Sequence, residues 1–124
     1  MTELGRIRKA NIADAEQVFR LTKDFAMSFT PDAVTFGQAF RTLVDQNDAL
    51  VLVADVSGKI AGYLVGFVHM TLFANGPVAL VEEVMVDEPL RSTGLGRRLM
   101  DEFEVWARTQ DARLVSAEIG RAHV

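Results

Sequence analysis

Residues 49–86 constrain the fold more than any other part of this sequence, because they contain three long apolar runs of strand character. In order, the runs cover residues 49–55, 60–70 and 78–86. They are rich in β-branched and aromatic side chains, and Ser57-Gly58-Lys59 and Asn75-Gly76-Pro77 separate them with residues typical of turns. The first two runs predict a β-hairpin. The third is apolar on both faces, except at Glu82 and Glu83, which is typical of a strand in the middle of a sheet.

Helical periodicity on both sides of these strands predicts a mixed α/β (α+β) fold. A short strand over residues 6–10 precedes two helices, of which the first ends near residue 29 and the second covers about residues 34–46. After the three apolar runs, a helix over about 93–110 precedes a strand over 113–118. The side chains expected to face the core recur at helical spacing: Val18, Leu21, Phe25 and Phe29; Phe36, Phe40, Leu43 and Val44; Leu95, Leu99, Phe103, Trp106 and Ala107. The order β-α-α-β-β-β-α-β and the length of 124 residues predict one domain over residues 1–124.

Charge and cysteine content exclude several function classes. A net charge of −4 gives no basic surface for nucleic acid or for an anionic membrane, so an anionic ligand must be bound locally. The absence of cysteine excludes disulfides, thiolate catalysis and cysteine-based metal sites, and we expect no metal cofactor. The first residues lack the apolar stretch of a signal peptide, and no apolar run is long enough to span a bilayer, so we expect a cytoplasmic protein.

The turn between the third apolar run and the helix after it carries the most informative residues. Gly94 and Gly96 stand at the start of this helix, and Arg91, Arg97 and Arg98 surround them. The N-terminus of a helix carries partial positive charge, so arginines at this end are electrostatically unfavourable for an isolated helix. It becomes favourable when an external polyanion lies on the backbone N–H groups that glycine leaves accessible, and diphosphate is the natural candidate.

Two glycines alone also fit a plain tight turn with solvated arginines. The dinucleotide-binding pattern requires a third glycine where this sequence has Leu99, and the Walker pattern requires a Gly-Lys-Ser/Thr that is absent. A nucleotide-binding α/β domain that uses the same anion loop stays an alternative.

The turn Arg91-Ser92-Thr93-Gly94-Leu95-Gly96 resembles motif A of the GNAT acetyltransferase superfamily, Arg/Gln-x-x-Gly-x-Gly/Ala, and the strand before it and the helix after it match as well. The resemblance covers about residues 6–117 and implies a GNAT-type mixed central sheet. It implies that the pyrophosphate of acetyl-CoA lies on the loop and that pantetheine pairs with the preceding strand. The implied cofactor-binding residues are Val84, Met85, Val86, Arg91, Ser92, Thr93, Gly94, Leu95, Gly96 and Arg97.

The same resemblance implies that an acidic residue on the central strand, Glu82 or Glu83, removes a proton from the acceptor amine or binds it. Strand side chains alternate between faces, so only one of the two glutamates faces the acceptor directly unless a bulge re-aims them. Both also fit a structural ion pair. Tyr63 and His69 lie on a neighbouring strand, where a half-buried structural role is the simpler interpretation.

These features predict acetyl transfer from acetyl-CoA to a primary amine of a small molecule or peptide, by direct attack in a ternary complex. The alternative is a catalytically silent CoA-binding or regulatory domain. The family's general acid is a tyrosine in a later helix, and no tyrosine follows Tyr63, so none is assigned.

The sequence after about Ala117 departs from the family, which continues with a further helix and strands. Ile119-Gly120-Arg121-Ala122-His123-Val124 matches the translation of a widely used sequencing adapter, ATC GGA AGA GCA CAC GTC. We therefore expect residues of about 119–124 to be non-native and the natural gene to continue differently. The fold would then lack its final helix and strands, and the exposed sheet edge would favour association, for example as a homodimer.

Overall fold

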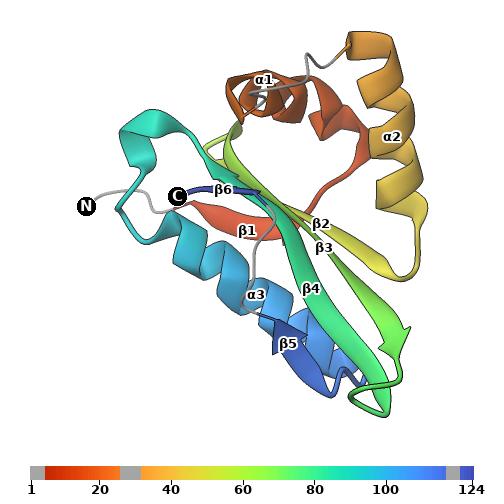
Figure 1. The fold of residues 1–124 in the computed structure, drawn as a ribbon. Helices are drawn as coiled ribbons and strands as arrows, with labels where there is room; N and C mark the ends of the chain where they lie inside the picture. Colours follow the sequence, from red (N-terminus) through yellow and green to blue (C-terminus); the bar gives the residue numbers. More distant parts are fainter. Residues whose placement is uncertain (1–4, 26–31, 117–120) are drawn as a thin grey trace.

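The computed structural model describes residues 5–25, 32–116 and 121–124. Along the chain the elements are β1 (Arg6–Lys9), η1 (Ile12–Asp14), α1 (Ala15–Phe25), α2 (Ala33–Asp45), β2 (Ala49–Val56), β3 (Lys59–Thr71), β4 (Gly76–Val86), η2 (Glu88–Leu90), α3 (Leu95–Thr109), β5 (Leu114–Ser116) and β6 (Arg121–His123). A central sheet separates two helical layers, with α1 and α2 over one face and α3 over the other (Figure 1).

The sheet has the strand order β1-β2-β3-β4-β5, and its first four strands are antiparallel neighbours. β4 and β5 are parallel, and Val78–Leu80 of β4 pair with Leu114–Ser116 of β5. The same edge of β4 then pairs, again in parallel, with β6. The sheet is therefore mixed, as expected, and β6 is a strand that the sequence interpretation did not include.

Each face of the sheet has its own apolar core. α3 packs Leu95, Leu99, Phe103 and Ala107 against the sheet, and Trp106 lies at the margin of this cluster. On the other face, Val18 and Leu21 of α1 and Phe40 of α2 are buried, with Phe36, Leu43 and Val44 partly buried around them. These positions confirm the predicted inward faces. The side chain of Phe25 and all of Phe29 lie outside the described residues.

β4 changes its alternation at a bulge. Val65 of β3 pairs with Glu83 and the next residue, Gly66, pairs with Val81, so Glu82 is the extra residue. Ala79 and Val81 pack in the α3 core before this point, whereas Val84 and Val86 do so after it. In an unbroken strand, Glu83 would point to the same face as Val81 and would enter the α3 core. Because Glu82 is inserted between them, Glu83 points to the opposite face.

Arg8 joins the first strand to its neighbours. Its guanidinium donates two hydrogen bonds to the carboxylate of Asp14, at 2.8 and 2.9 Å, and one to Asp55 of β2 at 3.1 Å. The hydrogen bonds from Arg8 hold the pKa of Asp14 below its usual range. Asp14 also accepts the N–H of Asn11 in a capping box, so η1 is fixed to the start of the sheet.

The predicted boundaries agree closely with the described elements. The helix expected over 93–110 is α3 with Gly94 at its N-cap, and the strand expected over 113–118 is β5, Leu114–Ser116. The last two residues expected in this strand, 117 and 118, lie outside the described residues. No helix among the described residues is long and apolar enough to cross a membrane.

We expect Gly66→Ala to lower the free energy of unfolding by about 2 kcal/mol, the usual cost of overpacking a core. A Cβ at residue 66 would lie 2.6 Å from Cζ of Phe103 and 3.0 Å from the carbonyl oxygen of Leu80. The backbone oxygen cannot move without disturbing the β3–β4 ladder, so the strain cannot relax easily. Urea denaturation of the two proteins measures the difference.

Gly37→Ala is the matched control, because a Cβ at residue 37 of α2 meets nothing within 4 Å. Alanine in a helix interior is more favourable than glycine, so this variant should gain about 0.5–1 kcal/mol. An unchanged stability for Gly66→Ala would contradict the close approach of Phe103 to β3.

Candidate functional site

The connection from β4 to α3 builds an exposed backbone loop. The chain leaves β4 at Val86, passes through η2 and reaches Gly94, which has a left-handed φ of 92° at the N-cap of α3. Glycine adopts this conformation without steric cost. Gly94 offers no capping side chain, and the first turn of α3 contains no acidic residue. Neither device that usually satisfies a helix N-terminus is therefore present here.

The loop is exposed up to Gly94 and buried after it. Ser92, Thr93 and Gly94 are exposed, whereas Leu95 and Gly96 are buried against the core. The first N–H groups of an α-helix have no intrahelical acceptor, and the helix dipole places partial positive charge on them. The arrangement suits a bound anion such as a phosphate group.

The structure separates the three arginines that the sequence interpretation grouped around the loop. Arg91 turns back toward β4, where its Nε donates to the carbonyl oxygen of Val86 at 2.8 Å. Arg98 reaches across to β1 and donates to the carbonyl oxygen of Gly5 at 2.9 Å. Arg97 is exposed beside the loop. Arg91 therefore fixes the end of β4 as well as lying next to the anion loop.

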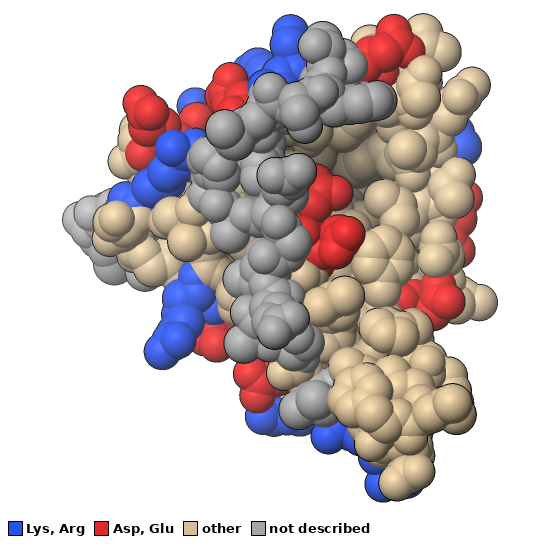
Figure 2. Space-filling view, viewed as in Figure 1, with Lys and Arg blue, Asp and Glu red and all other residues tan. Residues whose placement is uncertain are grey.

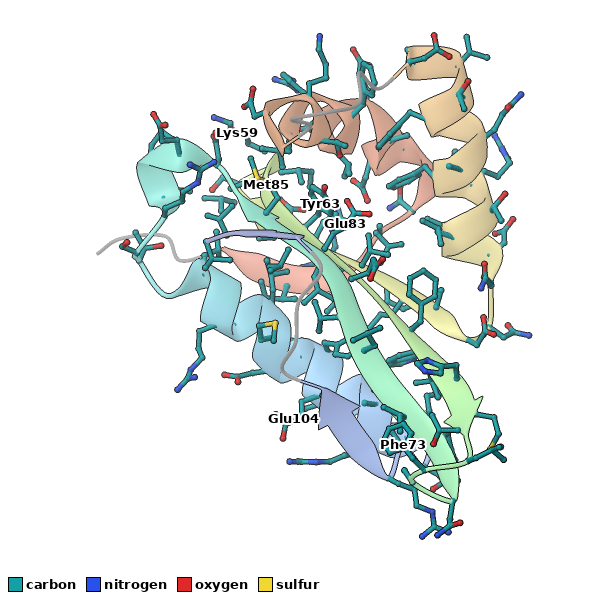
Figure 3. All side chains as sticks on the ribbon, in the orientation of Figure 1. Lys59, Tyr63, Phe73, Glu83, Met85 and Glu104 are labelled. Atoms are coloured by element: carbon teal, nitrogen blue, oxygen red, sulfur yellow. The ribbon has the colours of Figure 1, made fainter. Side chains whose placement is uncertain are left out.

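Glu83 lies on the α1–α2 face of β4 and contacts Tyr63. The hydroxyl of Tyr63 donates to Oε1 of Glu83 at 2.9 Å, and the two side chains lie together below α1 in Figure 3. Thr22 of α1 contributes a hydroxyl 3.2 Å from that of Tyr63. Glu83 is half-buried, and among the described residues no donor lies on its Oε2. The bond from Tyr63 fixes one of the two carboxylate oxygens.

Burial raises the pKa of Tyr63 far above its usual range, and the nearby charge of Glu83 raises it further. The phenol therefore stays protonated near neutral pH and acts as a donor to the carboxylate. Tyr63 is only 1% exposed, so its hydroxyl serves Glu83 and not the solvent.

Glu82 is in a different environment. It is the extra residue of the bulge and is exposed, and no hydrogen bond or ion pair holds its carboxylate among the described residues. In Figure 2, acidic side chains appear at the centre of this face, where the surface is hollowed between the α1–α2 layer and β4. The bulge thus places the two adjacent glutamates in different environments.

The strand segment Val84–Val86 joins Glu83 to the loop. Val84 and Val86 are fully buried toward α3, and Met85 is fully buried toward α1 and α2. Their backbone, on the edge of β4 away from β3, runs toward the loop, and β6 pairs with it at Val84 and Met85. The strand, Glu83 and the loop therefore form one continuous site.

Sequence reasoning treated Tyr63 as a structural side chain and so missed its bond to Glu83. The register of β3 against β4 sets this contact, and the bulge shifts that register by one residue. His69, for which the sequence predicted a half-buried structural role, is exposed farther along β3, opposite Val78. It lies apart from Glu83.

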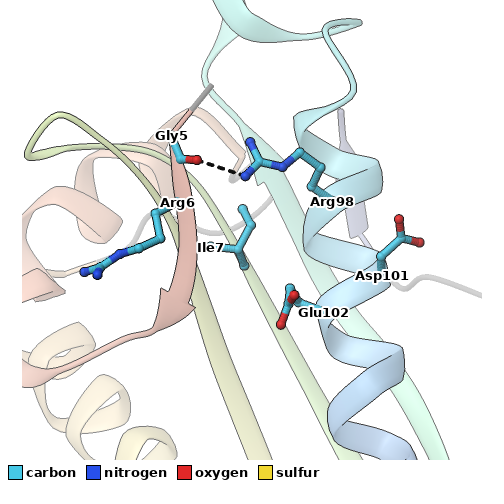
Figure 4. Close-up of a pocket in the computed structure, with 6 residues that line it drawn as sticks. All are labelled: Gly5, Arg6, Ile7, Arg98, Asp101 and Glu102. Carbon is cyan, nitrogen blue, oxygen red and sulfur yellow. Dashed lines mark hydrogen bonds between the residues drawn. The ribbon is translucent and has the colours of Figure 1, made fainter. Parts of the chain in front are cut away.

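A second hollow, of about 400 Å³, lies between β1 and α3 (Figure 4). Its lining consists of Gly5, Arg6, Ile7, Arg98, Asp101 and Glu102. β2 and β3 separate β1 from β4, so this hollow is not part of the site described above. In the part of the chain that the structure describes, no group of histidine and acidic residues could hold a metal ion.

The chain matches one family model and resembles several solved structures. A family model described as the acetyltransferase (GNAT) family matches residues 15–123. No curated protein sequence matches the chain.

Solved structures with the same fold include several acetyltransferases. A transcriptional regulator from Bacillus halodurans aligns with a TM-score of 0.79 at 21% identity, over 97% of this chain and 81% of that one. Glucosamine-6-phosphate N-acetyltransferase from Arabidopsis thaliana aligns with a TM-score of 0.78 at 19% identity, over 96% and 81%. An aminoglycoside antibiotic 6′-N-acetyltransferase from Acinetobacter haemolyticus aligns with a TM-score of 0.77 at 20% identity, over 90% and 79%.

Proposed function

Because the chain belongs to the GNAT acetyltransferase family, whose model matches residues 15–123, we propose that it binds acetyl-CoA and transfers the acetyl group to a primary amine. The family match carries this proposal. The loop before α3 and the carboxylate of Glu83 support it, because they supply an anion site and a proton acceptor on one strand and its continuation.

The proposed cofactor-binding residues follow β4 into the loop. Backbone N–H groups between Ser92 and Arg97 hold the diphosphate, and the open space around Gly94 admits it. The edge of β4 at Val84, Met85 and Val86 pairs with the pantetheine amides, in the manner of an added strand. Arg91 keeps the end of β4 in place for both parts.

Acetyl-CoA supplies an activated thioester. Backbone N–H groups at the end of β4 polarise its carbonyl group, which favours attack by the amine nitrogen. Glu83 first takes a proton from the acceptor's ammonium group, directly or through one water, which frees the lone pair of the nitrogen. The C–N bond then forms as the C–S bond breaks, and the departing CoA thiolate takes up the second proton of the nitrogen. We propose Glu83 for this role over Glu82 because its carboxylate is held by Tyr63, whereas Glu82 is exposed on the bulge.

The proposed acceptor is a small molecule or peptide with a protonated amine. The net charge of −4 and the acidic side chains in the hollow of Figure 2 favour a cationic acceptor over an anionic one. The solved neighbours that act on glucosamine-6-phosphate and on aminoglycosides both have amine acceptors, which is consistent with this class. We place the reaction in the cytoplasm.

Tyr63→Phe tests the positioning role of the phenol. The variant loses the hydrogen bond to Oε1 of Glu83, and a hydrogen bond to a charged group is worth about 1.5–3 kcal/mol, so kcat should fall about tenfold or more. The dissociation constant for CoA should stay unchanged, because Tyr63 does not touch the loop. A variant that loses CoA affinity and keeps kcat would show that Tyr63 only supports the fold.

Turnover and binding separate the proposed enzyme from a silent CoA-binding domain. Release of free thiol from acetyl-CoA should accelerate with at least one member of a panel of amines that covers polyamines, aminoglycosides, lysine peptides and peptide N-termini. Tight binding of CoA without turnover across the panel would favour the silent domain. Binding of nucleotides in preference to CoA would favour a general nucleotide-binding loop.

A further inference from the structure

The edge of β4 away from β3 is occupied by another part of the same chain. Residues 121–123 pair in parallel with Glu83–Met85, so that Ala122 lies opposite Val84 and His123 opposite Met85. In Figure 1, β5 lies along the first half of β4 and β6 along the second half, next to the loop before α3. The second half is the strand segment proposed for pantetheine.

Val124 continues this occupation into the loop. Its carbonyl oxygen accepts the backbone N–H of Ser92 at 3.1 Å. Its side chain lies so close to Gly96 that a Cβ on that glycine would be 2.8 Å from the Cβ of Val124. Ser92 and Gly96 both belong to the loop proposed for the diphosphate. One stretch of four residues, 121–124, therefore covers both the strand part and the loop part of the site.

We propose that residues 121–124 act as an intramolecular competitor of acyl-CoA in this chain, an inference that rests on the function proposed above. An extended peptide added to a strand edge satisfies the backbone N–H and C=O groups of that edge, and it excludes any second occupant that needs them. The segment is tethered to the site, so its effective concentration is in the millimolar range without any external ligand. CoA binds only to molecules in which the segment has left. A weak CoA affinity measured with this chain would therefore underestimate the affinity of the site itself, because only the fraction of molecules with an open β4 edge binds the ligand.

The test compares Ala122→Pro with Ala122→Ser in the full chain. Proline cannot donate a backbone hydrogen bond and disfavours a paired strand, whereas serine keeps the N–H and is nearly as small as alanine. Calorimetric titration with CoA gives the dissociation constant of each variant and of the parent. If the segment occupies the site in about nine molecules of ten, Ala122→Pro should bind CoA about tenfold more tightly than the parent, and Ala122→Ser like the parent.

Amide hydrogen exchange provides a second measurement. The N–H groups of residues 121–123 that point toward β4, and the N–H of Ser92 that Val124 accepts, should be protected in the parent without ligand. Those of residues 121–123 should lose that protection when CoA is added. Equal CoA affinities for the parent and Ala122→Pro, or no change in protection on CoA binding, would overturn the competition. No CoA binding by any of the three chains would overturn the proposed function, and the competition with it.

Discussion

Glu83→Gln is expected to lower kcat for acetyl transfer at least about 100-fold, the lower range for loss of a general base. The amide keeps the size of the side chain and can still accept the hydrogen bond from Tyr63, but it cannot take a proton from the amine. The rate of thiol release at saturating acetyl-CoA measures the effect, and the dissociation constant for CoA should not change.

Glu82→Gln is the matched control for this variant. It makes the same chemical change one residue earlier on β4, at the exposed bulge position, and its kcat should stay within about twofold of the parent because exposed groups away from the reacting atoms have small effects. A large loss in Glu82→Gln together with an active Glu83→Gln would move the base to the bulge residue. Equal, small effects in both would remove the carboxylates from the mechanism.

Gly94→Glu should weaken CoA binding about 100-fold or more. A Cβ at residue 94 meets nothing within 4 Å, so the side chain fits, but its carboxylate then lies at the positive end of α3 where the phosphates are proposed to bind. The carboxylate satisfies the exposed N–H groups and repels the incoming anion. Calorimetric titration with CoA measures the loss.

Strain at a positive φ must be separated from the effect of charge, and Gly58→Glu does this. Gly58 has φ of 90° and Gly94 has φ of 92°, and a Cβ at either position meets open space. The two variants therefore share a positive φ of nearly the same value and the same added charge, and only one lies in the proposed site. If Gly94→Glu binds CoA as well as Gly58→Glu does, the diphosphate does not lie on this loop.

The elements with local signals could be predicted from the sequence. Each of these signals lies within a short stretch of the chain. They are the turns at residues 57–59 and 75–77, the apolar stripe of α3 and the glycines at its start. For this reason the sequence alone predicts the strand–loop–helix unit, and the anion site stays a proposal within it. The GNAT family match then agrees with the resemblance seen in the loop.

Features that depend on pairing between distant segments could not be predicted. The bulge at Glu82 exists only in the register of β4 against β3, so the sequence left the roles of the two glutamates open. Arg98 donates a hydrogen bond to the carbonyl oxygen of Gly5, just before β1, which no local pattern indicates. The parallel pairing of β6 is a long-range contact of the same kind, and a three-residue strand gives too weak a pattern to assign.

The bulge in β4 also decides how mutations along this strand should be planned. Up to Val81, odd-numbered residues face the α3 core; after Glu82, even-numbered residues do, as Val84 and Val86 show. A library that varies every second codon would therefore alter one face of the sheet in the first half of the strand and the opposite face in the second. Mutations meant for the α1–α2 face should therefore be placed at even-numbered residues before Glu82 and at odd-numbered residues after it.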